Sequence, residues 1–183
     1  MHKFSHHHAE RLVRPERYAL LPPKEILQRF GLKEGMAVAD IGAGTGFFSR
    51  AAAEIVGRNG VVYAVDMSPE MLDYIRTTEP GSTVRTILSG EYSFPLLDAS
   101  ADLALLAFVV LETPDIPRFL AEAIRITRTG GSVIILDWKK QDEEHGPEKE
   151  ERLDMHELLS HLTGYSFTFG ELNASHYFVR IQN

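Results

Sequence analysis

One stretch of the chain, residues 38–48, constrains the fold more than any other. It reads VADIGAGTGFF, an apolar run, then three glycines at alternate positions, then two aromatic residues. The apolar run predicts a short buried strand, and the residues after Gly46 predict a helix. Glycine lets the backbone adopt positive φ angles and lets a ligand approach the main chain. Because the first N–H groups of the helix would point back at this turn, we interpret it as a binding site for a carboxylate or phosphate.

The spacing of the glycines separates two kinds of cofactor. A dinucleotide fingerprint places glycines at the first, third and sixth positions after the strand. Here the third glycine, Gly46, comes one position early, and Phe47 occupies the sixth position. The ring of Phe47 would lie where a pyrophosphate needs an open backbone. The spacing therefore favours a ligand with a smaller anion, such as an amino-acid carboxylate, over the cofactor of a nucleotide-dependent oxidoreductase.

The rest of the chain alternates apolar runs with helical patterns. Further buried strands are predicted at 60–66, 84–88, 102–110 and 132–138, and helices near 24–30, 47–56, 69–78, 115–127 and 152–162. Glycines 130 and 131 predict a tight turn before the fifth strand. Two final strands, 165–172 and 176–181, alternate apolar and polar residues and predict a half-exposed hairpin at a sheet edge. These patterns are typical of an α/β fold, a doubly wound, mostly parallel sheet with an antiparallel last strand.

Length and composition narrow the possibilities. The 183 residues fit an N-terminal arm or lid over 1–21 followed by a single domain over 22–183. The net charge of −7 disfavours nucleic acid as a partner, and the absence of cysteine excludes thiolate chemistry. No run of about 20 apolar residues and no signal peptide is present, so we expect a cytoplasmic protein without a membrane span. The charged stretch 139–154 is expected to be an exposed loop, and a homodimer remains open.

Ligands of such sheets bind outside the carboxyl ends of the strands, which places the stretches 42–46, 66–67, 89–91 and 108–112 at one edge. Asp66 ends the second strand and is a candidate to accept the ribose hydroxyls of a cofactor; the alternative is a solvated acid near a helix start. Residues 89–91 are candidates for an adenine edge, with Met67 on the adenine face. Asp40 is either a partner for an ammonium group or a structural acid.

Two motifs resemble class I S-adenosylmethionine-dependent methyltransferases, in the branch related to the C-methyltransferases of ubiquinone and menaquinone synthesis. Residues 38–46 match the first motif of this family and residues 62–72 match its acidic ribose motif; weaker matches are 89–91, 107–110 and 129–131. The resemblance implies a seven-strand Rossmann-like sheet, S-adenosylmethionine as cofactor and S-adenosylhomocysteine as product. No metal is expected. The expected cofactor-binding residues are Asp40, Gly42, Ala43, Gly44, Thr45, Gly46, Asp66, Met67, Ser89, Gly90, Glu91 and Phe108.

The predicted function is methyl transfer to a small molecule. The candidate proton acceptors are His7, His8 and Glu112, each of which is otherwise an exposed residue, so no catalytic residue is assigned. Related sequences often place a histidine before the acid, but here that residue is Leu111, which keeps a non-catalytic S-adenosylmethionine-binding module as an alternative. Trp138 is a candidate for the acceptor pocket or a packing residue. Whether His6, His7 and His8 are native or belong to a tag is left open.

Overall fold

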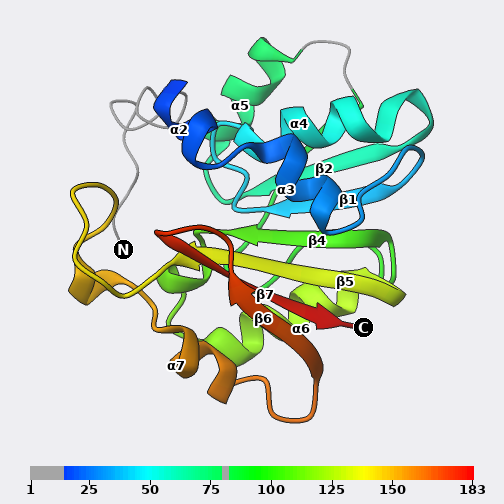
Figure 1. Ribbon diagram of the computed structural model, residues 1–183. Helices are drawn as coiled ribbons and strands as arrows, with labels where there is room; N and C mark the ends of the chain where they lie inside the picture. Colours follow the sequence, from blue (N-terminus) through cyan, green and yellow to red (C-terminus); the bar gives the residue numbers. More distant parts are fainter. Residues whose placement is uncertain (1–14, 80–82) are drawn as a thin grey trace. The chain divides into compact units, whose positions relative to one another are not determined.

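Seven strands form a doubly wound, mostly parallel sheet, as the sequence predicts. The computed structural model describes residues 15–79 and 83–183. The chain divides into two compact units, Met1–Gly90 and Glu91–Asn183 (Figure 1). In these described ranges, no helix combines the length and the apolar character that crossing a membrane requires.

The first unit is built on three parallel strands in the order β3-β2-β1. They are β1 (Ala37–Ile41), β2 (Val61–Asp66) and β3 (Val84–Leu88). The helices among the described residues of this unit are α2 (Pro15–Leu20), α3 (Pro23–Arg29), α4 (Phe47–Val56), η1 (Gly57–Asn59) and α5 (Pro69–Thr78). The central strands β1 and β2 are largely buried, which explains their nearly continuous apolar sequence. Ser68 caps α5, because its hydroxyl accepts the N–H of Met71 at 3.3 Å.

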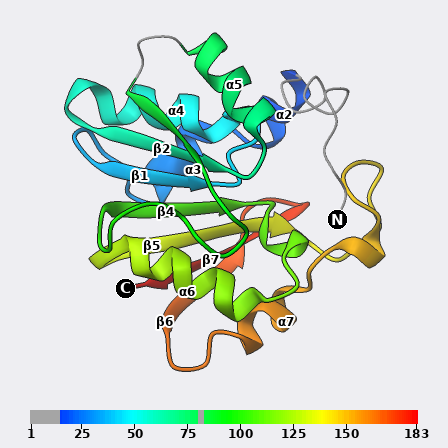
Figure 2. The same ribbon diagram turned by 180° about the vertical axis from the view of Figure 1, so that it is seen from behind.

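The second unit carries four strands in the order β4-β5-β7-β6. They are β4 (Ala101–Ala107), β5 (Thr127–Trp138), β6 (Ser166–Glu171) and β7 (His176–Gln182), and the helices are η2 (Val110–Glu112), α6 (Ile116–Ile126), η3 (Lys149–Glu151) and α7 (Met155–Ser160). Strand β5 is parallel to β4, whereas β7 runs antiparallel to both β5 and β6. Figure 2 shows α6 packed across β4 and β5. The antiparallel last strand is therefore confirmed.

An irregular segment, residues 89–100, stands where a crossover helix is usual, and no helix forms in these described residues. Arg125 of α6 holds the segment: its guanidinium donates to the carbonyl oxygens of Phe94 at 2.9 Å and Leu96 at 3.0 Å. It also pairs with the carboxylates of Glu122 at 2.7 Å and Asp98 at 2.5 Å. A single long-range arginine therefore orders a stretch that has no secondary structure of its own.

Three sequence-based expectations need correction. The expected turn at Gly130 and Gly131 lies inside β5, where the pairing with β4 shifts register. The helix expected at 152–162 is shorter, because Asp154 caps α7 through the N–H of His156 and Ser160 ends it. The predicted hairpin is confirmed, since β6 and β7 pair antiparallel at one edge of the sheet, but it is not half-exposed throughout: β7 is an interior strand with Val179 and Ile181 fully buried, and β6 is the outermost strand. Its Phe169 is 49% exposed, so the alternation of β6 does not mark a buried face.

Candidate functional site

The glycine turn between β1 and α4 has the backbone conformation that its sequence predicts. Gly42, Gly44 and Gly46 have φ angles of 71°, 53° and 80°, all in the left-handed region. A Cβ atom on Gly46 would lie 3.0 Å from Cγ1 of Ile75, so this position is restricted by packing as well as by its backbone. Three alternating left-handed residues fold the chain back on itself directly before the first turn of α4.

Asp66, at the end of β2, is hydrogen-bonded to this turn. Its Oδ2 accepts the N–H of Gly44 at 2.8 Å, and its Oδ1 accepts the N–H of Ser68 at 2.8 Å. Each carboxylate oxygen can accept about two hydrogen bonds, so both oxygens keep capacity for hydroxyl donors. The side chain is half-buried. Asp66 therefore joins the glycine turn to β2 and still fits the ribose diol of a nucleoside.

The buried polar side chains of the turn are unequally satisfied. The hydroxyl of Thr45 is buried, and within the described part of the chain it has no hydrogen-bond partner. Asp40 of β1 is also buried, but its Oδ2 accepts the hydroxyl of Ser49 at 2.6 Å. Burial raises the pKa of Asp40 to about 6, with a further contribution from the negative charge of Asp66. Asp40 is therefore anchored to α4, and a role toward an ammonium group stays a prediction.

The adenine candidates lie partly at this site. The N–H of Ser89 donates to the carbonyl oxygen of Asp66 at 3.0 Å, so Ser89 follows β3 beside the end of β2. Met67 is 44% exposed, which leaves its thioether side chain accessible to a ring. Ser89 and Met67 thus adjoin Asp66 in the first unit. Gly90 follows Ser89 and also belongs to the first unit, whereas the third adenine-edge candidate, Glu91, and the cofactor-binding candidate Phe108 belong to the second unit.

In the second unit, Phe108 leaves β4 in a left-handed conformation with φ of 62°. Such a φ angle is uncommon for a bulky residue and indicates local strain. The ring centroid of Phe108 lies 5.3 Å from that of His176 and 6.0 Å from that of Trp138, and the His176 and Trp138 centroids are 4.2 Å apart. The expected strand 102–110 therefore ends at Ala107, and Trp138 belongs to a three-ring cluster.

The carboxyl end of β5 carries an acid that sequence reasoning missed. Asp137 is fully buried; its Oδ1 accepts the N–H of Trp138 at 2.8 Å, and its Oδ2 has no hydrogen-bond partner in the residues that the structure describes. Burial raises the pKa of Asp137 to about 7, and the nearby negative charge of Glu112 adds to this effect. The positive charge of Arg152 opposes it. No local pattern marks Asp137, because an acid after an apolar strand is common in this sequence.

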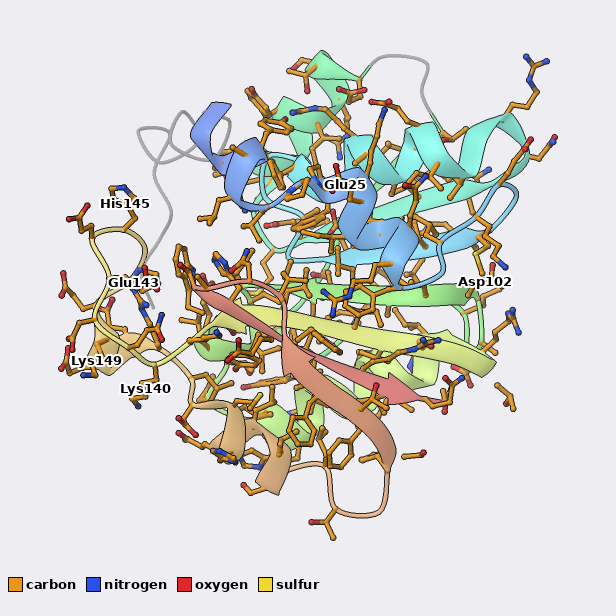
Figure 3. All side chains as sticks on the ribbon, in the orientation of Figure 1. Glu25, Asp102, Lys140, Glu143, His145 and Lys149 are labelled. Carbon is orange, nitrogen blue, oxygen red and sulfur yellow. The ribbon has the colours of Figure 1, made fainter. Side chains whose placement is uncertain are left out.

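The segment after β5 is mostly exposed, as expected, and Figure 3 shows its labelled side chains Lys140, Glu143, His145 and Lys149 along the loop. Arg152 and Leu153 are the exceptions, with 2% and 7% of their surfaces exposed. The guanidinium carbon of Arg152 lies 5.0 Å from the ring centroid of Trp138, and its N–H groups donate to four backbone carbonyl oxygens at 2.9–3.1 Å. Those carbonyls belong to Lys139, Gln141, His145 and Pro147. One buried arginine thus closes the loop over Trp138.

A cavity of about 480 Å³ lies beside this loop. It is lined by Val110 and Leu111 of η2, by the start of α6, by residues around Arg152 and by two residues from α7 onward, Glu157 and His161, whereas Glu112 is not among its lining residues. Its volume falls within the range of small-molecule pockets. Glu112, the candidate proton acceptor, is an exposed residue of η2. The other two candidates, His7 and His8, lie outside the described residues, as does His6. Among the described side chains, no group of three or more histidine and acidic residues could hold a metal ion.

Known proteins share this fold and about a third of the sequence over the matched residues. A family model described as a methyltransferase domain matches residues 39–135. A crystal structure of a SAM-dependent methyltransferase from Aquifex aeolicus has a TM-score of 0.91, 32% sequence identity, and coverage of 98% of both chains.

Two curated relatives match over shorter stretches. Demethylmenaquinone methyltransferase of Desulfitobacterium hafniense is 31% identical over 121 residues, which are 64% of this chain and 48% of the relative. Malonyl-[acyl-carrier protein] O-methyltransferase of Serratia marcescens is 37% identical over 100 residues, which are 55% of this chain and 37% of the relative. The chain thus spans about half or less of the length of these curated relatives.

Proposed function

The chain belongs to the family of S-adenosylmethionine-dependent methyltransferase domains, and we propose that it transfers the methyl group of S-adenosylmethionine to a small-molecule acceptor. The observation that carries this proposal is the contact between Asp66 and the N–H of Gly44 at 2.8 Å. That contact holds an acid proposed to bind the ribose beside a turn proposed to bind an amino-acid group. S-adenosylmethionine contains both a nucleoside and an amino-acid group, so it fits the two neighbouring sites.

Methyl transfer requires the protein to position the cofactor and the acceptor, and it does not require a reactive side chain. S-adenosylmethionine supplies an activated methyl group when bound. Asp66 would accept the ribose hydroxyls, the backbone of residues 42–46 would enclose the methionine part, and Met67 and Ser89 would contact the adenine. Fixing the reacting groups in line can account for roughly 7–11 kcal/mol of barrier lowering. The residues of the first unit would therefore contribute mainly by orientation.

The acceptor is proposed from the relatives and from the second unit. The relatives named above act, by their names, on demethylmenaquinone and on malonyl-[acyl-carrier protein]. When the acceptor must lose a proton, a general base raises the rate of methyl transfer by about 10²–10⁴-fold. The proposed base is Glu112 of η2.

Calorimetric titration with S-adenosylmethionine and S-adenosylhomocysteine tests the cofactor assignment. Replacing Asp66 with Ala removes the acceptor of the ribose hydroxyls and one anchor of the turn, so we expect affinity to fall by about 100-fold or more. Asp66→Asn keeps one anchoring oxygen and is expected to lose less. Asp73→Ala is the matched control, because Asp73 is an exposed acid of α5 paired with Arg76. Binding that survives Asp66→Ala unchanged, or no binding by the folded wild type, would contradict the proposal.

Turnover separates an enzyme from a binding module. Wild-type protein, S-adenosylmethionine and a panel of acceptors, including a demethylated quinone and an acyl thioester, are incubated and assayed for S-adenosylhomocysteine. Release with one acceptor, reduced about 10²-fold or more by Glu112→Gln, supports methyl transfer with Glu112 as base. Tight cofactor binding with no release of S-adenosylhomocysteine across the panel supports the binding module. The sequence argument for that alternative is Leu111, which stands where related sequences often have a histidine.

A further inference from the structure

Strand β6 ends the sheet in the second unit, and among the described residues no other strand pairs with its outer side (Figure 1). It pairs antiparallel with β7 along its whole length, without a register shift. The N–H of Leu172, directly after β6, donates to the carbonyl oxygen of His176 at 2.9 Å. Because hydrogen-bonded and non-hydrogen-bonded pairs alternate along an antiparallel ladder, Phe167, Phe169 and Glu171 direct their N–H and C=O groups away from β7. The outer side of β6 therefore presents a row of backbone donors and acceptors.

This edge lacks the features that usually keep an edge strand from pairing with another chain. Natural edge strands carry lysine, proline or a bulge, or they are very short. The sequence of β6, SFTFGE, has no lysine and no proline, and its single charged residue, Glu171, is the last one. Phe169 is 49% exposed, and its ring centroid is 6.2 Å from that of Phe167. A regular, largely uncharged strand with two neighbouring aromatic rings favours the addition of another strand.

The sequence of β6 is close to a palindrome, which suits a second copy of the same strand. Around Thr168 it reads SFTFG, so an antiparallel pair centred on Thr168 places Phe167 of each copy opposite Phe169 of the other. Such cross-strand aromatic pairs stabilise a sheet. Both phenylalanines are outward-pointing backbone positions, so this register also matches the N–H and C=O groups of one copy with those of the other. A two-fold axis requires this kind of self-complementary surface.

Charge favours the same register. The chain has a net charge of −7, so two copies associate more easily when their acids stay apart. A pair centred on Thr168 separates the two Glu171 residues by about 20 Å along the strands, at about 3.4 Å per residue. A pair centred on Gly170 would bring them to diagonal positions about 7–8 Å apart. In the Thr168 register Glu171 instead lies opposite Tyr165, which is uncharged and 41% exposed.

We propose that this chain forms a homodimer in which β6 pairs antiparallel with β6 of a second copy, with the two-fold axis at Thr168. The sheets of the two second units then become continuous, and four phenylalanine rings lie side by side on one face. The pairing removes the open edge, because the outward donors and acceptors of each strand bond to the other. The inference is independent of the proposed function, since it uses neither the glycine turn nor Asp66.

Sedimentation equilibrium of the full chain tests the pairing. We expect the mass of wild type to rise with concentration from the 20.5 kDa of one chain toward twice that value, with a dissociation constant of about 1–100 µM, because one strand pair is a small interface. Thr168 is exposed, so its side chain can be changed without opening the core. Thr168→Lys and Thr168→Glu each place like charges opposite each other at the axis, and each should weaken association about fivefold or more. An equimolar mixture of the two variants places lysine opposite glutamate and should recover dimers.

Thr77→Lys is the matched control, because Thr77 is an exposed threonine of α5 in the first unit, and this variant should associate as wild type does. A wild type that keeps the mass of one chain at every concentration overturns the proposal. Thr168 variants that associate as wild type does, or a mixture that associates no better than the separate variants, also overturn it. Circular dichroism verifies that each variant is folded.

A cross-link gives a second measurement that does not depend on charge. The chain has no cysteine, so Thr168→Cys introduces a single thiol. At the axis the two Thr168 residues form a non-hydrogen-bonded pair, whose Cα atoms are about 4.5 Å apart, within the range that a disulfide spans. We expect mild oxidation to give the covalent dimer of Thr168→Cys much faster than that of Thr77→Cys at the same concentration. Equal rates for the two variants would show random collision and contradict the pairing.

Discussion

At the end of β1 the chain turns through three left-handed glycines, and Asp66 binds the amide of one of them. At the end of β5 the chain instead enters a charged loop, which buried Arg152 closes by binding four carbonyl oxygens. An acid binds amides in the first region, and an arginine binds carbonyls in the second. The first region depends on residue types that set their own backbone angles. The second depends on one side chain whose carbonyl partners lie 5 to 13 residues before it in the chain. The glycine turn should therefore tolerate side-chain changes outside its glycines better than the β5 loop tolerates loss of Arg152.

The largest expected effect is on the β5 loop. Arg152→Met leaves four carbonyls without their donor and removes the cation above Trp138, so we expect a loss of about 3–5 kcal/mol in the free energy of unfolding. Trp138 is the only tryptophan of the chain, so its fluorescence during urea unfolding reports on this loop directly. Lys149→Met is the control, because Lys149 forms an exposed pair with Asp142. A loss below about 1 kcal/mol would mean that the loop keeps its structure without Arg152, and the proposed difference between the β5 loop and the glycine turn would be wrong.

Two glycine-to-alanine substitutions test what restricts the glycine turn between β1 and α4. Gly46→Ala combines an unfavourable φ of 80° with a Cβ placed 3.0 Å from Ile75, and we expect a loss of about 2–3 kcal/mol. Gly31→Ala carries only the backbone penalty of a φ of 91°, because within the described ranges no atom lies within 4 Å of its Cβ position. It should lose about 1–2 kcal/mol. Equal losses in chemical denaturation would show that backbone conformation, rather than packing on α5, restricts the turn.

The smallest expected effect is the pH dependence of stability at Asp137. The unfolded chain releases this proton near pH 4, whereas the folded chain keeps it to about pH 7, so folding binds a proton between these values. Asp137 therefore contributes a fall in wild-type stability as the pH rises from 4 to 7. The groups facing Asp137 are Glu112 of η2, Arg152 after η3 and Tyr177 of β7.

Asp137→Asn removes that proton uptake. We expect its stability at pH 8, relative to pH 4, to exceed that of wild type by about 1–2 kcal/mol in urea titrations, less than the roughly 4 kcal/mol that a shift of about three pKa units would give in full, because relaxation and water penetration reduce the cost of the buried charge. Asp40, with a raised pKa of its own, leaves a smaller fall between pH 4 and 6 in both proteins. Asp98→Asn, a change at an 80% exposed side chain, should follow the wild-type profile. A variant profile parallel to wild type would show that Asp137 is ionised throughout the range.

Much of the first unit could be predicted because its determinants are local. The apolar runs define β1 and β2, Ser68 starts α5, and the alternating glycines match three left-handed residues. The position of Asp66 after β2 was also predictable, but its hydrogen bond to Gly44 was not. That bond depends on the parallel register of β1 and β2, in which Ile41 pairs with Val65. The local pattern identified the residues, and the sheet decided which of them meet.

In the second unit the sequence was less informative, because partners far apart in the chain decide burial. Arg152 lies in a charged stretch and reads as a surface residue, yet the ring of Trp138 and the surrounding carbonyls bury it. Asp137 reads as one more acid after a strand, and only the packing of η2 and β7 around it isolates its second oxygen. The sequence by itself determined the order of the strands, the cap of α5 and the conformations of the glycines at 42–46, since each depends on neighbouring residues. Tertiary structure alone decided which charges leave water, because removal from water requires groups from several elements to close around one side chain.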